Sequence, residues 1–437
     1  MRGETRTELC IVGGGFTGLW AALHAKREDP DRDVVLLEAR TIGFGASGRN
    51  GGFVVPSLTH GLANGLSRFP DEMELLERLG RENLRGLVAD IERLGIACDL
   101  ELTGELLPAL APYQEAGLET ERELAQRYGY DVQTFPDAAA MQGEVASPTY
   151  RAGIWVKDGG GILDPGQLAI GLMRAALRAG VRIHESTPAL GLEDRPDGVV
   201  VRGARGSVQA RKVLLATSAF PPLLRALRRY LVAVYDYVLV TEPLTPRQRA
   251  TIGWPRRQGI GDGANQFHYY RLTRDERILW GGYDAVYRFG SPVRDDLDEH
   301  EPTFGRLAQN FFTTFPQLEG LRFTHRWGGA IDTCSRFSVF FGTAHHGRVA
   351  YAVGYTGLGV GATRFGAQVA LDLLNGRRTE ATVSRYVQRK PVPFPPEPLR
   401  TAVIALTRNR LAAADRRDGR RGLWLGLLDR LGLGFDS

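Results

Sequence analysis

Three glycines near the start of the chain, Gly13, Gly15 and Gly18, have the spacing G-x-G-x-x-G between an apolar run and a helical pattern. Such a turn lets a pyrophosphate approach the backbone and the first amides of the helix. A second apolar run follows and ends near Glu38, where an acid accepts hydrogen bonds from ribose hydroxyls. These four residues predict a dinucleotide site.

A long glycine-rich passage over residues 41–54 comes next, where a nicotinamide-binding fold would run on into another helix and strand. Ser47, Arg49 and Asn50 are embedded in it. A loop of this composition exposes many backbone amides and can lie close to a flat ring system. The passage therefore favours a flavin over a nicotinamide.

The elements that would position these residues follow from periodicity. The strings LCIV and DVVLLEA read as short buried parallel strands around a helix. Apolar residues recur at helical spacing in MELLERLGRENLRGLVADIERLG, and strand-like alternation appears in YDYVLVTEPL, FHYYRL and RILWGGYD. We expect an early parallel sheet, then a helical segment, then a second sheet above the flavin.

With its string GASGRNGG, the glycine-rich passage resembles the D-amino-acid oxidase-like flavoproteins, which include glycine and sarcosine oxidases. Within that family it is similar to the gamma-glutamylputrescine oxidoreductase-like branch. The resemblance continues over residues 159–187, 211–220, 351–376 and 395–400, with Ser218 in place of the usual glycine or asparagine. It extends over nearly the whole chain.

This resemblance implies an α/β fold with an α+β substrate lobe. A Rossmann-like FAD-binding domain of the glutathione-reductase and D-amino-acid oxidase type would carry an inserted antiparallel-sheet substrate domain. The implied segments are residues 1–60, 150–230 and 325–385 for the discontinuous FAD-binding domain, 61–149 and 231–324 for the substrate domain, and 386–437 for a C-terminal helical extension.

The resemblance also implies which residues bind FAD. They are Gly13, Gly15, Phe16, Thr17, Gly18, Glu38, Ala39, Arg40, Gly45, Ala46, Ser47, Arg49, Asn50, Gly51, Gly52, Ala189, Ala216, Thr217, Thr333, Gly354, Tyr355, Thr356, Gly357, Gly359 and Val360. The helix that follows Gly357 would direct its N-terminus at the flavin pyrimidine and stabilise negative charge there. Some relatives attach flavin to a cysteine near Cys334, but its offset differs by several residues, so we expect noncovalent FAD.

The implied reaction is oxidation of a C–N bond in a small amine or amino acid to an imine, which water hydrolyses to a carbonyl compound. The expected acceptor is O2, with release of H2O2. The alternatives are a dehydrogenase or partner subunit that passes electrons elsewhere, and a flavoprotein without amine oxidation. A hydroxylase would be expected to show a second dinucleotide fingerprint, and the sequence shows none.

The catalytic candidates are Arg49, Asn50, Tyr269, Arg271 and Asp332. Arg49 and Asn50 resemble the family's residues at the flavin edge, with the alternative that Arg49 only holds loop carbonyls. Tyr269 and Arg271 share one face of a predicted strand, and either that face or the opposite one lines the substrate cavity. Pairing of Arg271 with Asp275 is the other possibility.

Asp332 lies where glycine-oxidase-like relatives carry an arginine that clamps the substrate carboxylate. An acid at this place favours a cationic amine, as in the putrescine-type branch. The alternatives are that Asp332 caps a turn or pairs with Arg326 or Arg336. Tyr235 and Tyr237 also share a face and could wall the cavity, although ordinary core packing explains them nearly as well.

Composition sets outer limits on the function. A chain of 437 residues is too long for one simple core, and 43% apolar with 24% charged residues is typical of a soluble globular protein. The net charge of +5 is spread among 50 acids, so we expect no nucleic-acid binding. The three cysteines are far apart and the histidines lack ligand spacing, so we expect neither disulfides nor a metal site.

The two ends of the chain give the remaining expectations. The polar N-terminus and the lack of an 18-residue apolar run predict a cytoplasmic enzyme without a membrane span. The arginine-rich C-terminal helices should pack on their own domain or on a second subunit of a possible homodimer, with docking on a membrane surface as the alternative. Of four lysines, only Lys157 precedes a flavin-domain motif, so no oxygen-activating residue is assigned.

Overall fold

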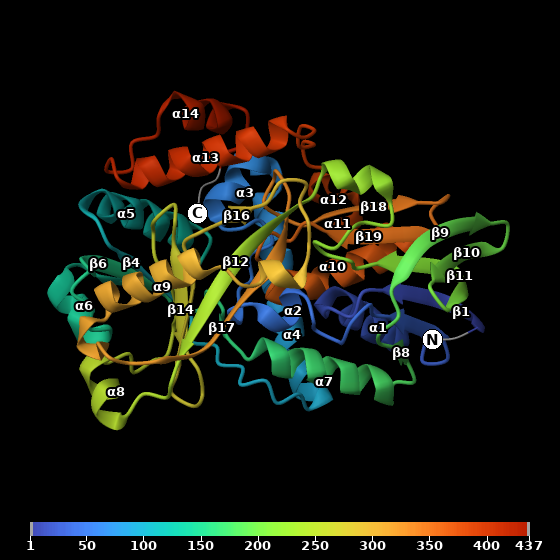
Figure 1. Ribbon diagram of the computed structural model, residues 1–437, viewed down its shortest axis with the longest axis horizontal. Helices are drawn as coiled ribbons and strands as arrows, with labels where there is room; N and C mark the ends of the chain where they lie inside the picture. Colours follow the sequence, from blue (N-terminus) through green and yellow to red (C-terminus); the bar gives the residue numbers. More distant parts are fainter. Residues whose placement is uncertain (1–2, 435–437) are drawn as a thin grey trace.

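The computed structural model describes residues 3–434 and contains two large sheets, which lie side by side in Figure 1. We name the two halves by their sheets. The parallel-sheet domain lies on the right of the figure, the antiparallel-sheet lobe lies on the left, and the C-terminal helices, in red, lie across the top. The first two residues and the last three, which belong to predicted segments, lie outside the described residues.

The parallel-sheet domain is built on five parallel strands in the order β19-β11-β1-β2-β8. Every residue of VVLL in β2 is buried, as in a sheet covered on both faces. The antiparallel strand β18 and the hairpin β9–β10 extend this sheet. The strands are β1 (Gly3–Val12), β2 (Val34–Leu37), β8 (Arg182–His184), β9 (Ala189–Arg195), β10 (Gly198–Gly203), β11 (Gly206–Leu215), β18 (Phe340–Ala344) and β19 (Val349–Val353).

Helices cover this sheet because their small residues allow close approach. Helix α1 (Phe16–Glu28) is buried over its first ten residues and packs between α7 (Pro165–Arg178) and α10 (Gly359–Leu374). Helix α4 (Met73–Leu94) also packs on α10 and contributes Leu87 to the same core. The core of this domain therefore lies between its sheet and a layer of four helices.

The antiparallel-sheet lobe has the strand order β16-β12-β15-β14-β13-β4-β6-β5, with β17 paired along the length of β12. The pairs are antiparallel except for β13 with β4. The strands are β4 (Glu105–Ala109), β5 (Val132–Phe135), β6 (Ala152–Val156), β12 (Val232–Thr241), β13 (Gly259–Gly261), β14 (His268–Leu272), β15 (Ile278–Gly282), β16 (Val286–Tyr287) and β17 (Phe323–Thr333).

The two faces of this second sheet differ. One face packs under α9 (Glu301–Thr314) in an aromatic-rich core that includes Tyr270 and Trp280. The opposite face carries a small apolar cluster of Val238, Val240, Leu279, Tyr269 and Trp327. Alternation along each strand separates the two sets of side chains.

The remaining elements lie outside the two large sheets. The short strands β3 (Phe53–Val54) and β7 (Gly161–Ile162) pair with each other. The helices are α2 (Ala46–Arg49), α3 (Leu62–Arg68), α5 (Pro112–Arg127), α6 (Ala138–Glu144), α8 (Pro246–Ile252), α11 (Glu380–Val383), α12 (Arg385–Gln388), α13 (Leu399–Asp415) and α14 (Leu423–Arg430), with 3-10 turns η1 (Pro70–Glu72), η2 (Arg225–Arg229), η3 (Asp295–Leu297) and η4 (Pro316–Leu318).

Three elements differ from the predicted segment borders. Strand β6 and most of β17 lie within segments predicted for the FAD domain, yet both pair in the antiparallel sheet. Helix α4 lies in a segment predicted for the substrate domain but packs into the parallel-sheet core. Pairing register and helix packing decide these places, and neither can be derived from local periodicity.

The C-terminal helices pack on their own chain through α13. The Asp415 carboxylate at the end of α13 accepts hydrogen bonds from the backbone amides of Asn265 and Gln266 in the antiparallel-sheet lobe. Helix α14 leaves Leu423 fully exposed. A homodimer through this end of the molecule stays a prediction. Within residues 3–434, no helix has the length and apolarity that crossing a membrane requires.

Candidate functional site

The turn between β1 and α1 can be built only from glycine. Gly13 has φ +114°, and a Cβ there would lie 2.2 Å from the Ala216 carbonyl oxygen. A Cβ on Gly18 would lie 2.0 Å from the Gly13 carbonyl oxygen. The Phe16 amide at the start of α1 donates to Ser47 Oγ over 2.9 Å, so the glycine-rich passage lies directly against this turn. The structure therefore brings two predicted cofactor residues, Phe16 and Ser47, into contact.

Glu38 lies at the carboxyl end of β2, beside the turn. Its carboxylate accepts hydrogen bonds from the amides of Gly14 (2.7 Å) and Arg40 (2.8 Å) and remains partly exposed. The Thr187 amide donates to the Glu38 carbonyl over 2.8 Å and thereby brings the start of β9, with Ala189, to the same edge. An oriented acid at the mouth of the turn is suited to hydroxyl groups.

Arg49 is directed into its own loop. Nε donates to the Phe44 carbonyl (2.8 Å), one terminal nitrogen donates to the Gly328 carbonyl (2.9 Å), and the guanidinium pairs with Asp298. The Arg49 side chain therefore connects the glycine-rich loop with β17 and with the segment after η3. This is the arrangement expected if the arginine holds loop carbonyls.

Asn50 also stabilises the loop. Its amide nitrogen donates to the carbonyls of Ala46 (3.0 Å) and Ser47 (2.9 Å), and its amide oxygen accepts from Gly52 N (2.8 Å). These contacts close the short helix α2 and fix the path of the next residues. Gly45, Ala46, Ser47, Gly51 and Gly52 thus form one ordered cradle.

Asp332 lies behind a second glycine-rich loop, at the start of α10. The buried carboxylate accepts a hydrogen bond from Gly354 N (2.6 Å), and Thr356 N donates to the Asp332 carbonyl (3.2 Å). Burial raises the pKa of Asp332 to about 6. Thr17 of α1 donates to the Tyr355 hydroxyl over 2.9 Å, which ties this loop to the first turn.

The contacts of Asp332 match the capping alternative. Its predicted arginine partners are engaged elsewhere, because Arg326 pairs with Glu301 and Arg336 donates to backbone carbonyls such as that of Tyr386. The other predicted cofactor residues lie near the ends of strands or the start of a helix. Ala39 follows Glu38, Thr217 follows Ala216 after β11, Thr333 ends β17, and Gly357, Gly359 and Val360 lie at the start of α10.

The antiparallel sheet meets the glycine-rich loop through one face of β14. The Tyr269 ring lies against Gly51 and Gly281, where a Cβ on either glycine would be within 2.6 Å of ring or hydroxyl atoms. Its hydroxyl donates to Asp236 over 2.5 Å. Arg271 Nε donates to the Gly51 carbonyl. Tyr269 and Arg271 therefore share the face directed at the loop.

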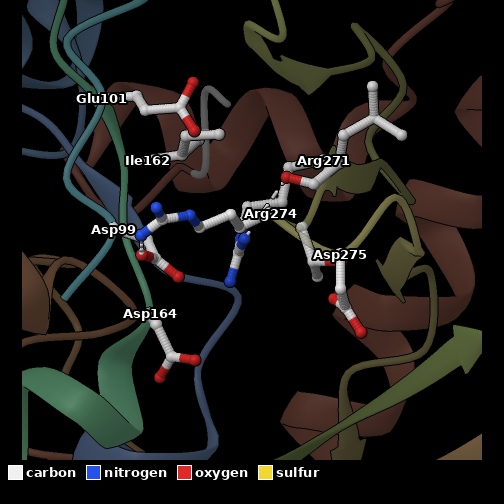
Figure 2. A pocket seen from close by; sticks show the side chains of 9 residues that line it. Asp99, Glu101, Ile162, Asp164, Arg271, Arg274 and Asp275 are labelled. Atoms are coloured by element: carbon white, nitrogen blue, oxygen red, sulfur yellow. Dashed lines mark hydrogen bonds and ion pairs between the residues drawn. The ribbon is translucent and has the colours of Figure 1, made fainter. Parts of the chain in front are cut away.

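Arg271 is buried and borders a cavity of about 320 Å³. Figure 2 shows Asp99, Glu101 and Asp164 along one side of this cavity and Arg274 reaching across it. Burial lowers the pKa of Arg271 to about 10. The predicted alternative partner, Asp275, pairs with Arg277. Arg271 thus links the antiparallel sheet to the glycine-rich loop through its hydrogen bond to the Gly51 carbonyl.

Tyr235 and Tyr237 face away from the loop. Both rings are buried in the core beneath α9, and the Tyr237 hydroxyl donates to the Leu297 carbonyl over 2.8 Å. His268 and Tyr270, which alternate with the loop-facing residues on β14, stack on Trp280 in the same core. For Tyr235 and Tyr237 the structure agrees with the alternative of ordinary core packing.

The family comparison matches a model described as FAD-dependent oxidoreductase (DAO) over residues 8–373. The chain belongs to this family. The match spans the glycine turn, the loop and both sheets, so the expected resemblance and the expected cofactor, FAD, are confirmed.

Individual relatives agree with the family assignment. The FAD-dependent oxidoreductase is 34% identical over 377 residues to gamma-glutamylputrescine oxidoreductase of Escherichia coli, with 84% of each chain covered. It is 22% identical over 345 residues to sarcosine oxidase subunit beta of Rhodobacter capsulatus, with 75% of each covered. The solved structure of glycine oxidase from Geobacillus kaustophilus superposes with a TM-score of 0.74 at 18% identity, covering 89% of this chain and 100% of the other. This likeness confirms the predicted fold class.

The residues of this oxidoreductase fit FAD. The cradle is lined by glycines whose Cβ atoms would collide, as at Gly15, where a Cβ would lie 2.8 Å from Ser47 Oγ. The Glu38 carboxylate has the chemistry to accept hydrogen bonds from ribose hydroxyls, and the N-terminus of α1 has the chemistry to bind a phosphate. Cys334 is fully buried and its thiol donates to the Ser338 carbonyl, which fits the expectation of noncovalent attachment.

Sequence reasoning missed one acid that the structure brings to the loop-facing side. Asp236 lies between Tyr235 and Tyr237 in a strand that is otherwise apolar. A charge in such a strand is a signal in itself, because burying a carboxylate is costly. By contrast, Lys157 pairs with Asp131 at the protein surface. No group of three or more metal-ligating side chains occurs in the part of the chain that is described.

Proposed function

We propose that this FAD-dependent oxidoreductase oxidises the C–N bond of a small amine, with an amino acid as the less favoured substrate. The observation that carries the proposal is the meeting of the Gly51 loop with the sheet face that bears Tyr269 and Asp236. This places a carboxylate and an aromatic wall beside the loop that resembles the flavin-binding loop of the family. Relatives named for amine and amino-acid oxidation support the same reaction class.

The chemistry divides between cofactor and protein. Bound FAD supplies a two-electron acceptor for the hydride that leaves the carbon next to the nitrogen. The substrate nitrogen must be neutral when that hydride departs, so a proton has to leave the ammonium form first. The resulting imine takes up water and yields a carbonyl compound and ammonia or an amine.

The residues of this chain bind, orient and exclude water. Arg271 fixes the Gly51 carbonyl, so the loop and the sheet keep a constant separation. Val238, Leu279 and Trp327 provide apolar walls that exclude water from the space beside Tyr269. The N-terminus of α10 contributes unpaired backbone amides that stabilise negative charge nearby.

Electron transfer to O2, with release of H2O2, is part of the proposal. The similarity to a sarcosine oxidase beta subunit supports a second candidate, in which this chain passes electrons to another acceptor or subunit. A cytoplasmic location, noncovalent FAD and a homodimer stay predictions from the sequence.

A product assay tests the proposed reaction. Purified holoenzyme is incubated in air with a panel of alkyl amines, diamines and amino acids, and carbonyl products are trapped with a hydrazine. The proposal predicts a trapped carbonyl for amines and an equal amount of H2O2. A carbonyl product without H2O2 supports the second candidate, whereas no carbonyl product from any compound contradicts amine oxidation.

A further inference from the structure

Asp236 occupies an unusual position for a carboxylate. It lies in the middle of β12, pairs across the sheet with Gly329 of β17, and belongs to the face directed at the glycine-rich loop. It keeps accessible surface although burial raises its pKa to about 6. Asp236 is therefore desolvated without being fully enclosed.

Three donors hold this carboxylate in place. The Tyr269 hydroxyl donates to one oxygen over 2.5 Å and the Tyr237 amide donates to the other over 2.9 Å. The Gly282 amide also donates to it and, like the other two donors, lowers its pKa. These donors are neutral, so the geometry is fixed while the negative charge remains unbalanced.

Within residues 3–434, Asp236 forms no ion pair with an arginine or lysine. Arg49 of the loop has a side-chain carbon 3.4 Å from a Cβ built on Gly329, but its guanidinium is paired with Asp298. Buried carboxylates usually have a partner of opposite charge. A cationic group of a ligand could supply the opposite charge.

The surroundings fit an alkylammonium group. Val238 is apolar, and the rings of Tyr269 and Trp327 lie in the same cluster on this face. Aromatic faces attract ammonium groups, and apolar walls accept the alkyl chain attached to them. Neither feature suits a second carboxylate, which Asp236 would repel.

We infer that Asp236, held by Tyr269, is the binding site for the substrate ammonium group, and that the site selects cationic alkylamines over zwitterionic amino acids. The inference rests on the proposed amine oxidation and goes beyond it by naming the residue that binds the charged ammonium group of the substrate. It assigns to Asp236 the role that the sequence suggested for Asp332. Tyr269 acts as a positioning residue for the carboxylate.

An unreactive probe separates binding from turnover. In tert-butylamine the carbon next to the nitrogen carries no hydrogen, so it cannot be oxidised, while tert-butanol has a similar shape without charge. Calorimetric titration of holoenzyme should show binding of tert-butylammonium that weakens roughly ten- to hundredfold in Asp236→Asn. Binding of tert-butanol should be equal in both proteins.

Asp262→Asn is the matched control. Asp262 is another buried carboxyl of the same lobe, accepts hydrogen bonds from the His268 and Ala264 amides, and has a pKa that burial raises to about 7. It lies near α13, where Asp415 influences it. The control should bind tert-butylammonium as the wild type does, which excludes a general effect of losing a buried carboxylate.

The outcomes separate this inference from the proposed function. Equal binding of tert-butylammonium to wild type and Asp236→Asn, or no binding to the wild type, overturns the inference. If Asp236→Asn fails to fold, the wild type decides: binding should fall about tenfold per pH unit below pH 6 as Asp236 is protonated, and a flat profile overturns the inference. Charge-dependent binding without oxidation of any amine would refute only the proposed function.

Discussion

The two halves of the molecule recognise their ligands in different ways. In the parallel-sheet domain we expect FAD to meet backbone, because glycines such as Gly13 and Gly18 occupy positions where a Cβ would lie about 2 Å from a carbonyl oxygen. In the antiparallel-sheet lobe the ligand meets side chains, and Tyr269 and Asp236 act through the face on which they lie. The first mode tolerates no added atom, whereas the second can be tuned by single substitutions.

The comparison also explains why cofactor and substrate specificity can vary independently. The cradle for FAD is fixed by close backbone packing, so a family can keep it across many substrates. The sheet face presents exchangeable side chains on a rigid support. Substitutions in the glycine turn should therefore abolish cofactor retention, and substitutions on the loop-facing side of the antiparallel sheet should change which amine is oxidised.

The largest effect is expected at Gly18. Gly18→Ala puts a Cβ 2.0 Å from the Gly13 carbonyl oxygen, so the turn must open. We expect loss of bound FAD and destabilisation by more than about 3 kcal/mol, measured from flavin content and thermal melting.

Gly117→Ala is the control for this change, because Gly117 lies in α5 with no atom within 4 Å of its added Cβ. It should gain about 0.5–1 kcal/mol from the removal of a helical glycine. Normal FAD content in Gly18→Ala would show that the turn is not the cofactor cradle.

The next effect concerns Glu38. Replacing it with alanine removes the acceptor for ribose and releases the amides of Gly14 and Arg40. We expect FAD binding to weaken by roughly 1.5–3 kcal/mol, the contribution of a hydrogen bond to a charged group. Fluorescence titration of apoprotein with FAD measures it, and an unchanged dissociation constant would remove Glu38 from the site.

Asp332 provides an effect of similar size that depends on pH. Its folded pKa of about 6 exceeds the usual value of 3.8, so the folded state binds the proton more tightly than the unfolded state. This stabilisation is complete below about pH 4 and is lost as the pH rises through 6. Relative to Asp332→Asn, the wild type should lose on the order of 2–3 kcal/mol between pH 4 and 7.

Urea unfolding of both proteins at several pH values tests this expectation. Asp332→Asn keeps an oxygen that can accept from Gly354 N, so its flavin reduction by amines should stay within a factor of about two. A large loss of amine affinity in Asp332→Asn, with normal FAD content, would indicate that Asp332 binds the substrate amine and would contradict the capping role.

The smallest effect is expected at Tyr237. Tyr237→Phe removes the hydrogen bond to the Leu297 carbonyl and should cost about 0.5–1.5 kcal/mol of stability, without changing amine oxidation. Steady-state kinetics beside chemical denaturation measure both quantities. A selective change in the KM for amines would mean that this face of β12 also contacts substrate.

The glycine turn could be predicted from the sequence, whereas the partners of the polar side chains could not. Gly13, Gly15 and Gly18 with Glu38 could be placed because their spacing is imposed by one local turn. The roles of Arg49 and Asn50 could not, because their partners Asp298 and Gly52 depend on how loops close. A local sequence motif predicts a turn, but it does not predict which distant residues will pair with a side chain.

The acid at the substrate face shows the same limit. Asp332 attracted notice through resemblance, yet its partner, Gly354 N, comes from a loop 22 residues later. Asp236 was not predicted as a site residue, because only the pairing of β12 with β15 and β17 shows which face of the strand meets the loop. The pairing of β6 and β17 in the antiparallel sheet could not be predicted for the same reason, since strand pairing is not local.

Anaerobic mixing of holoenzyme with amines tests the central claim most directly. If the parallel-sheet domain holds FAD beside the Asp236 face, an amine with a hydrogen on the carbon next to nitrogen should bleach the yellow flavin band without any nicotinamide. tert-Butylamine should leave the band intact. Bleaching by NADH or NADPH, with no bleaching by any amine or amino acid, would contradict the account.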